Sequence, residues 1–409
     1  MPVTVRRRRL SLFALTLLVG LGISSWVTRT PAIRDALDAS TAQMGLILFG
    51  LSVGSMTGVL AAGSLVRRHG TRPVAVVGTL LVVGGVAVVG LAAAAGLAVG
   101  AFAGLALVGL GGGLGEISLN IEGAALERET GRQVLPILHG SFSLGTVIGA
   151  LVGIGLTAVA FPVVWHLLGA AAVMGGLAAW ALPGVPAGTG RVARADGARE
   201  AAAGRRPSVW RDSRLLLIGL VVLAMAFAEG AANDWLPLLM VDGHGMSATD
   251  GSLVYAGFAA AMTVGRFAGG PVVTRFGRAP VLSVSAVCAV VGIGVVVLSS
   301  SPLVAGIAVV LWGLGASLGF PVAISAAGDD PDRGAERVSA VATSGYLAFL
   351  VGPPLLGFLG EHAGLRQAML VVVVLLVAAA FAARAATPRP RAAPDAVGAD
   401  RAGGPGTEG

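Results

Sequence analysis

Long apolar runs separated by short polar segments recur along the whole chain of 409 residues. Each run is about 20 residues long, which is the length of helix that crosses the hydrocarbon core of a bilayer. Because an open strand edge cannot lie in lipid, we predict helices. The twelve predicted membrane-spanning helices cover residues 10–28, 42–65, 73–95, 97–122, 134–158, 161–182, 213–239, 251–273, 280–299, 302–327, 337–359 and 366–384.

The composition agrees with a chain that faces lipid. Only 12% of the residues are charged, 55% are hydrophobic, and the mean hydropathy is +0.86. A soluble domain carries roughly 25% charged residues, so this chain could not cover a water-facing surface. The 63 glycines suit helices that approach one another closely in a membrane. We therefore predict an all-α polytopic membrane protein, with the lipid bilayer as its surroundings.

The longest polar stretch between predicted helices divides them six and six. It covers residues 183–212, is rich in Pro, Gly, Ala and Arg, and has the composition of a flexible linker. We expect six-helix bundles at 1–182 and 213–385 and a disordered tail at 386–409. The first apolar run follows four arginines, Arg6 to Arg9, but no small-residue cleavage site follows it, so we expect it to remain as the first helix.

The arginines predict the orientation. All 28 basic residues are arginines, and 25 of them fall in segments that lie on one side if the helices alternate in direction. Only Arg29, Arg34 and Arg366 fall on the other side. Because positive residues are retained on the cytoplasmic side, we expect both termini inside and a location in the inner membrane.

Two segments of the first half recur in the second half. Gly109-Leu-Gly-Gly-Gly-Leu-Gly115 matches Gly313-Leu-Gly-Ala-Ser-Leu-Gly319 at an offset of 204, and Arg67 to Val74 matches Thr274 to Val281 at an offset of 207. Two matches at nearly one offset indicate an internal duplication. Duplicated halves joined by a loop predict a site at their interface and alternating access.

Several classes of function are excluded or disfavoured. A phosphate-binding Walker loop needs a lysine, which is absent, so the chain is not an ATP-driven pump through its own residues. The net charge of +7 is accounted for by topology, so we expect no nucleic-acid partner. Five scattered histidines and the single Cys288 form no pattern for a metal site or an enzyme nucleophile. We expect no cofactor, no metal and no enzymatic activity.

The loops after the second and eighth predicted helices carry a recognisable motif. Gly63-Ser-Leu-Val-Arg-Arg-His-Gly-Thr-Arg72 and Gly270-Pro-Val-Val-Thr-Arg-Phe-Gly-Arg278 resemble the signature Gly-x-x-x-Asp-Arg-x-Gly-Arg of the major facilitator superfamily. The resemblance covers residues 10–384 and implies a secondary transporter in which helices 1, 4, 7 and 10 line a central cavity. The signature Asp, which helps to latch the outward-facing state in that family, is replaced by Arg67 and Thr274.

Other segments resemble a narrower branch that includes rhizopine-transporter-like proteins. They are Asn120-x-Glu122, Glu127 to Arg132, His139 to Gly145, Glu229 to Trp235 and Gly352 to Gly357. The fifth helix lacks the Gly-Pro signature of drug/proton antiporters, which tilts against a dedicated drug exporter. A proton-coupled carrier of a small solute, working as a monomer, is the leading hypothesis; antiport export of a metabolite or drug-like compound and a non-transporting sensor are the alternatives.

Ionisable groups inside a bilayer cost about 2.5–3.5 kcal/mol even on lenient scales, so each needs a reason. Glu229 lies mid-way along the seventh predicted helix, and Glu116 lies in the inner half of the fourth. An apolar setting favours the neutral acid, so such carboxyls can exchange protons near neutrality. His139, at a depth similar to that of Glu116, could relay a proton to it. Glu229, Glu116 and His139 are therefore the predicted proton-coupling residues, with structural pairing as the alternative.

Four further residues are predicted to bind substrate, with helix packing as the alternative. Asn120 follows Glu116 by four residues and Asn233 follows Glu229 by four, so each shares its glutamate's helix face. Trp312 and Tyr346 lie mid-way along the tenth and eleventh helices. The neighbouring Asp234 and Trp235 are expected near the outer interface, as a solvated cap and an interfacial anchor.

The remaining candidates are predicted to form gates. Glu122 is expected to pair with Arg128 or Arg132. Arg266, in the inner third of the eighth helix, either pairs with a carboxylate at the interface of the halves or extends to the headgroups. Gly352-Pro353-Pro354 is expected to break the eleventh helix and to serve as a hinge. The other predicted gating residues are the loop arginines Arg67, Arg68, Arg72, Arg275 and Arg278.

Overall fold

The computed structural model describes residues 4–131, 134–191, 212–329 and 333–387, and every regular element in these ranges is helical. The helices of the first half are α1 (Val5–Val27), α2 (Thr30–Ala36), α3 (Thr41–His69), α4 (Thr71–Ala94), α5 (Ala98–Thr130), α6 (Leu135–Ala158) and α7 (Val163–Ala181). Those of the second half are α9 (Ser213–His244), α10 (Ala248–Phe276), α11 (Arg278–Leu298), α12 (Pro302–Ser317), α13 (Gly319–Ala327), α14 (Gly334–Ala363), α15 (Leu365–Ala368) and α16 (Leu370–Ala382).

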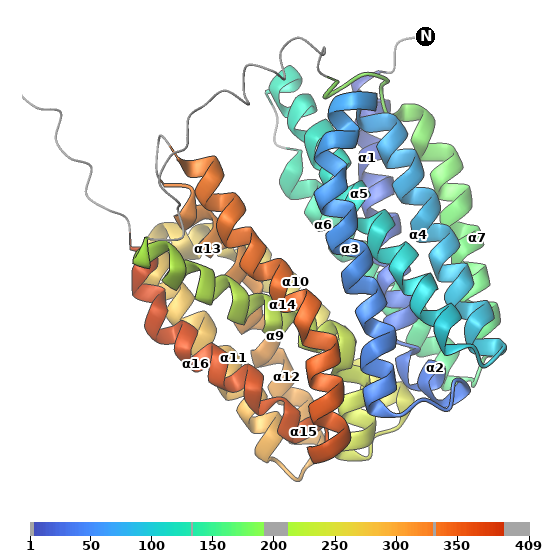
Figure 1. Cartoon of the computed structure of the whole chain (residues 1–409), viewed down its shortest axis with the longest axis vertical. Coiled ribbons are helices and arrows are strands. Elements are labelled where there is room, and N and C mark those ends of the chain that lie inside the picture. The colour runs from blue at the N-terminus through green and yellow to red at the C-terminus, as the bar shows by residue number, and fades with distance from the viewer. Residues whose placement is uncertain (1–3, 132–133, 192–211, 330–332, 388–409) are drawn as a thin grey trace, which may run out of the picture.

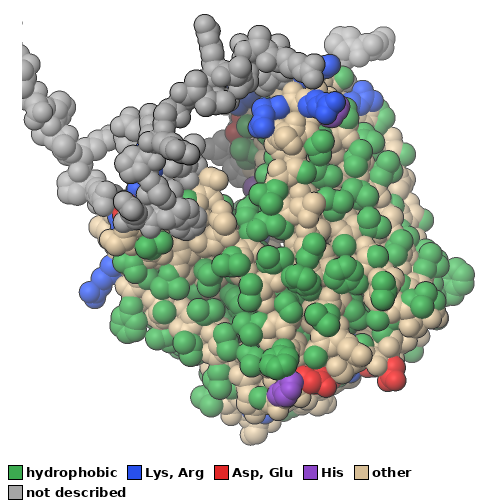
Figure 2. Space-filling view, viewed as in Figure 1, with side chains coloured by type: hydrophobic (Ala, Val, Ile, Leu, Met, Phe, Trp, Pro, Cys, Tyr) green, Lys and Arg blue, Asp and Glu red, His purple; other side chains and the backbone are tan. Residues whose placement is uncertain are grey.

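Eleven stretches of these helices are long and apolar enough to cross a membrane. Two of these stretches are each formed by two consecutive helices, α12 with α13 and α15 with α16. The one predicted span that is not among them, 251–273, corresponds to α10, which has 29 residues but carries Arg266 within its length. Figure 2 shows the result on one face, where apolar side chains cover the middle and arginines gather at the end near the N-terminus. The predicted all-α polytopic membrane fold is confirmed.

The helices form two bundles that lie side by side (Figure 1). In the first, α3, α4 and α5 pack together and α1 packs on α6 and α7. In the second, α9 packs on α10, α14 and α16, and α11 packs on α12 and α16. Below, the end that holds the start of α1 is called the arginine-rich end, and the end that holds α2 and α15 is called the opposite end.

The duplication inferred from the sequence is visible in the backbone. Gly70, between α3 and α4, has φ 87° and ψ 170°, and Gly277, between α10 and α11, has φ 80° and ψ 165°. A side chain would be strained at this positive φ, so both copies of the loop require glycine. The two glycines are 207 residues apart, which is the offset of the repeated motif around them.

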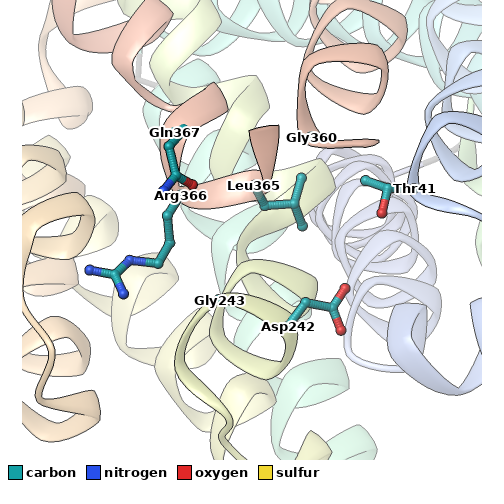
Figure 3. A pocket seen from close by; sticks show the side chains of 8 residues that line it. Thr41, Asp242, Gly243, Gly360, Leu365, Arg366 and Gln367 are labelled. Atoms are coloured by element: carbon teal, nitrogen blue, oxygen red, sulfur yellow. The ribbon is translucent and has the colours of Figure 1, made fainter. Parts of the chain in front are cut away.

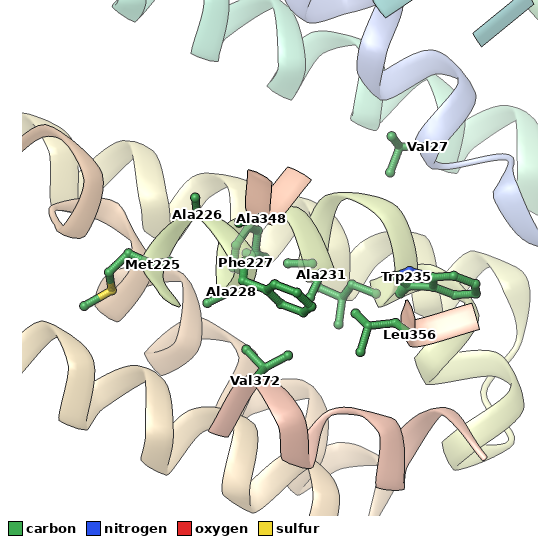
Figure 4. Close-up of a cluster of buried hydrophobic side chains, with 14 of the residues drawn as sticks. Val27, Met225, Ala226, Phe227, Ala228, Ala231, Trp235, Ala348, Leu356 and Val372 are labelled. Atoms are coloured by element: carbon green, nitrogen blue, oxygen red, sulfur yellow. The ribbon is translucent and has the colours of Figure 1, made fainter. Parts of the chain in front are cut away.

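The central helix of the second bundle is α9. Its residues from Met225 to Met240 are almost all buried, and Figure 4 shows its side chains packed against Ala348 and Leu356 of α14 and Val372 of α16. Because α9 also contacts α2 and α1 of the first bundle, its side chains reach both the core of its own half and the interface between the halves.

The bundles meet closely along α3 and α14. A Cβ added to Gly45 would lie 2.7 Å from the carbonyl oxygen of Pro353 and 3.0 Å from the Cα of Gly357, so backbone packs directly on backbone. The expected break at Gly352-Pro353-Pro354 is absent, because α14 runs from Gly334 to Ala363 without interruption. Proline at 353 has no N–H for the carbonyl of Phe349 one turn earlier. The hydroxyl of Ser52 on α3 donates to that carbonyl at 2.6 Å and so ties the halves together.

Candidate functional site

An ion pair lies near the middle of the second bundle, on the side that faces the first. Nη2 of Arg266 on α10 lies 2.8 Å from Oε1 of Glu229 on α9. The side chains retain 35% and 19% of their accessible surface. Of the two predictions for Arg266, pairing with a carboxylate therefore describes this structure, and extension to the headgroups does not.

Two side chains of the first bundle face this pair. Glu116 on α5 is accessible and interacts electrostatically with Glu229 and with Tyr346 of α14. His139 on α6 is accessible and interacts electrostatically with Arg266. Since these interactions cross from one bundle to the other, the exposed surfaces of Glu116 and His139 face the space between the bundles. Glu116, His139, Glu229, Arg266 and Tyr346 are called the central site below.

The other predicted substrate-binding residues are placed differently from one another. Asn120 is half-buried on α5, one turn from Glu116. Asn233 accepts a hydrogen bond from the buried hydroxyl of Tyr255 on α10 at 3.4 Å. Trp312 is fully buried; its Nε1 donates to the carbonyl oxygen of Ala228 and its ring packs edge-on against Phe258. Trp312 thus packs α12 on α9 and α10 in this conformation and offers no surface to a solute.

The expectations for Asp234 and Trp235 are wrong. Both are buried, Asp234 at 6% exposure and Trp235 at 0%, and neither is a solvated cap or an interfacial anchor. The reason is the length of α9, whose 32 residues continue to His244, so that both residues lie inside the helix rather than at its end.

Glu122 pairs with Arg8 rather than with Arg128, one of the two partners predicted for it. Glu122 is fully buried and accepts from Nε of Arg8 on α1 and from the hydroxyl of Thr71 on α4, each at 2.6 Å. Arg8 also reaches Glu129 at 2.6 Å. Arg128 is exposed and makes no ion pair within the described residues, and Arg132 lies outside them. We call Arg8, Thr71, Glu122 and Glu129 the first cluster.

The same arrangement recurs in the second bundle. Asp329 lies 2.5 Å from Nη1 of Arg278 and 3.7 Å from Nη2 of Arg214. Arg214, Asp329 and Arg278 follow Arg8, Glu122 and Thr71 by 206, 207 and 207 residues, so they hold equivalent places in the duplicated fold. We call them the second cluster. The duplication is the sequence signal that relates the two clusters to each other.

The other loop arginines make few contacts. Arg275 lies over the ring of Phe276 at 5.4 Å. Arg67 and Arg68 are exposed and Arg72 is half-buried, and no ion pair joins them to another described residue. They lie at the arginine-rich end of α3 and the start of α4.

Within the described parts of the chain, hydrogen bonds and ion pairs join the two bundles toward the opposite end and, through Ser52 and Phe349, near the middle of α3. Arg34 of α2 pairs with Asp242 of α9, and the N–H of Ala42 donates to Glu361 at 3.1 Å. The hydroxyl of Ser252 donates to the carbonyl of Thr28 at 2.8 Å. The accessible side chains of the central site therefore face the arginine-rich end.

A pocket of about 230 Å³ lies at the opposite end, where the two bundles are in contact. It is lined by Thr41 of α3, Asp242 of α9 and the loop before α15. Figure 3 shows the Arg366 side chain directed away from Asp242. Its guanidinium donates to the carbonyls of Val297 and Ser299, so its charge is used to hold α15 on α11. The pocket belongs to the closed contact and has no free charged group to bind a solute. No group of three or more metal-ligating side chains occurs in the described residues.

Comparison with known proteins decides the family. The profile of the Major Facilitator Superfamily matches residues 12–335 and 235–406. The chain belongs to the major facilitator superfamily. Its resemblance to this superfamily, drawn from the loop motifs, is thereby confirmed, and the chain is a secondary transporter rather than an enzyme.

Individual superfamily members cover nearly the whole chain. An uncharacterised MFS-type transporter of Yersinia pestis is 29% identical and covers 90% of this chain and 93% of its own length. The uncharacterised transporter y4wD of Sinorhizobium fredii is 31% identical, covering 87% and 92%. The membrane protein MosC of Rhizobium meliloti is 25% identical, covering 89% and 86%. The crystal structure of a point mutant of the nucleoside transporter NupG has a TM-score of 0.74 at 14% identity, covering 93% of this chain and 99% of its own, and supports the fold alone.

Proposed function

We propose that the protein carries a small polar solute across the inner membrane by alternating access, coupled to protons at Glu229 and Glu116. The central site carries this proposal: Arg266 pairs with Glu229 of its own bundle, and Glu116 of the other bundle lies within electrostatic range of Glu229. Two carboxylates and one guanidinium leave one negative charge, which a proton can balance.

The ion pair gives the coupling a physical mechanism. When Glu229 is ionised it holds Arg266, and when it is protonated it loses most of its attraction for the guanidinium. Arg266 is then free to interact with Glu116 or with a bound solute. His139 approaches Arg266 from the first bundle, so movement of one bundle relative to the other changes the balance of charge at the pair.

The same proposal sets the orientation and the remaining roles. With the arginine-rich end in the cytoplasm, both termini are cytoplasmic and the central site faces inward in this conformation. Residues 183–212 connect two bundles that move relative to each other, and residues 386–409 form a cytoplasmic tail. Asn120, Asn233 and Tyr346 contribute hydrogen bonds to the solute, and the protein works as a monomer. The second cluster and the loop arginines act at the cytoplasmic gate.

The test is a measurement of lumenal pH in proteoliposomes that hold the purified protein and a trapped pH-sensitive dye. A panel of sugars, polyols, amino acids and nucleosides is added outside, one compound at a time. One compound should move protons in the wild type, and Glu229→Gln should abolish that movement. The matched control is Asp250→Asn, which changes an exposed carboxyl that is hydrogen-bonded to Ser247 at the start of α10.

The sign of the pH change separates the two directions of transport. Acidification of the lumen would indicate symport with the solute, and alkalinisation would indicate antiport and favour the export alternative. Proton movement that persists unchanged in Glu229→Gln would remove Glu229 from the coupling mechanism.

A further inference from the structure

Asp234 is a buried carboxyl that the proposed mechanism has not used. It is only 6% exposed, and within the described residues neither a hydrogen bond nor an ion pair reaches it. An ionised carboxylate without a cation or donor is costly in such a place, so the neutral acid is the stable form in this conformation.

Asp234 lies between the central site and the opposite end. It follows Glu229 by five residues on α9, which places it about 7.5 Å further along the helix axis at 1.5 Å per residue. Tyr255 of α10 is fully buried and interacts electrostatically with both carboxyls. Its hydroxyl also bonds to Asn233, the residue before Asp234. Glu229 and Asp234 therefore share one polar neighbour.

The barrier between Asp234 and the opposite end is the contact between the two bundles. Trp235, the next residue, is fully buried, and a carbon of its ring lies 3.4 Å from the position of a Cβ on Gly45 of α3. Gly45 is also the residue that packs on the backbone of α14 at Pro353 and Gly357. The contact that Trp235 makes beside Asp234 is thus one that must part when the opposite end opens.

We propose that Asp234 is a second proton-binding carboxyl of the transport cycle, loaded from the opposite side of the membrane. This inference rests on the proposed function. Opening of the α3–α14 contact gives the carboxyl access to water on that side, where it takes up a proton. As the contact closes, Asp234 is buried as the neutral acid, the form that is stable in this conformation. Its proton then passes to the carboxylate of Glu229, which releases Arg266 and leaves Asp234 ionised until the contact opens again. The titratable groups that act here are Glu229 on the same helix and Tyr255 on α10.

The first test is infrared spectroscopy of the full-length protein in proteoliposomes. The wild type should show the carbonyl stretch of a protonated carboxylic acid that persists in mildly alkaline buffer, and Asp234→Asn should lose one such band. The control Asp250→Asn alters an exposed carboxyl and should leave the band intact. A band that is absent from the wild type, or unchanged in Asp234→Asn, would overturn the proposal.

The second test uses the lumenal dye and the same panel of sugars, polyols, amino acids and nucleosides. Asp234→Asn should slow the solute-dependent pH change by about 100-fold, the lower end of the range for a positioned proton donor. Downhill flux of that compound should be retained, which shows that the variant is folded. Tyr255→Phe, which keeps Asp234 buried, should slow proton movement less. Wild-type proton movement in Asp234→Asn would overturn this inference alone, whereas no proton movement in the wild type would overturn the proposed function and this inference with it.

Discussion

The two polar clusters at the arginine-rich end occupy equivalent places in the duplicated fold but differ in burial. In the first cluster the side chains of Arg8 and Glu122 are 9% and 0% exposed, whereas in the second those of Arg278 and Asp329 are 26% and 27% exposed. The charge balance also differs, because Arg8 meets two carboxylates, Glu122 and Glu129.

The difference in burial indicates that the two copies of this arrangement have different roles. A buried ion pair is costly to break because one charge is left without a partner. An exposed pair contributes little and is weakened by salt. We infer that the first cluster fixes α1, α4 and α5 as a rigid unit, and that the second can open and close during transport.

Neutralisation of Glu122 in the first cluster should have the largest effect on the stability of the protein. Glu122→Gln leaves the Arg8 guanidinium buried against a neutral amide and should destabilise the protein by about 3 kcal/mol, the low end for a broken buried pair. The measurement is thermal unfolding of the purified protein in detergent. Glu129→Gln is the matched control; its partly exposed carboxyl should cost less than about 1 kcal/mol. Equal losses in the two variants would contradict the assigned difference.

Thr71 should contribute less to the free energy of unfolding than Glu122 does. It should contribute more than Arg278, its more exposed counterpart in the second cluster. Thr71→Val keeps the shape of the side chain and removes the hydroxyl that donates to Glu122. Loss of a hydrogen bond to a charged group should cost about 1.5–3 kcal/mol. Arg278→Met, at the equivalent position of the second bundle, should cost less than Thr71→Val. The reverse order in the same unfolding measurement would show that burial does not distinguish the clusters.

Acid should weaken the cap of α9 but not the cap of α1. Asp212 caps α9 and pairs with Arg337 at 2.7 Å, whereas the equivalent cap of α1 is the uncharged Thr4. Burial raises the pKa of Asp212, but the Arg337 hydrogen bond and charge, with two backbone N–H donors, lower it by more, so the net shift is downward. A depressed pKa contributes stability above the ordinary aspartate pKa, and this stability is lost as the pH falls through the folded-state value.

The test of this acid dependence compares the unfolding midpoints of wild type and Asp212→Asn as the pH falls. Asparagine caps a helix as well as aspartate does, so Asp212→Asn removes the ion pair and leaves the cap. The difference between the two proteins should be about 1 kcal/mol or less at neutral pH and should vanish in acid. A difference that grows as the pH falls would contradict the direction of the shift.

The smallest effect is expected for the acid of the second cluster. Asp329→Asn should change the free energy of unfolding by less than about 1 kcal/mol, and added salt should remove the difference. Its effect should instead be seen in transport, as a changed rate of the pH-coupled flux. A destabilisation as large as that of Glu122→Gln would show that the second cluster is structural too.

Much of the fold was predictable because hydrophobic length and arginine distribution depend only on the local sequence. The twelve helices and the duplicated loops followed from these patterns. The pairing of Glu122 with Arg8 was not predictable in the same way, since 114 residues separate them and Arg8 was interpreted only as a topological signal. The burial of Asp234 was missed because it depends on how far α9 extends past its apolar run. The uninterrupted α14 depends on Ser52 of another helix, which satisfies a carbonyl that proline leaves free.

We expect the central site to lie between the bundles and to be accessible from the arginine-rich end. The direct test is thiol labelling of Glu116→Cys in a Cys288→Ser background, with a membrane-impermeant reagent added to one side of oriented vesicles. His69→Cys and Ala95→Cys, exposed at the arginine-rich and opposite ends, report the two sides. We predict that Glu116→Cys reacts faster from the side that labels His69→Cys. Faster reaction from the side that labels Ala95→Cys would contradict the account.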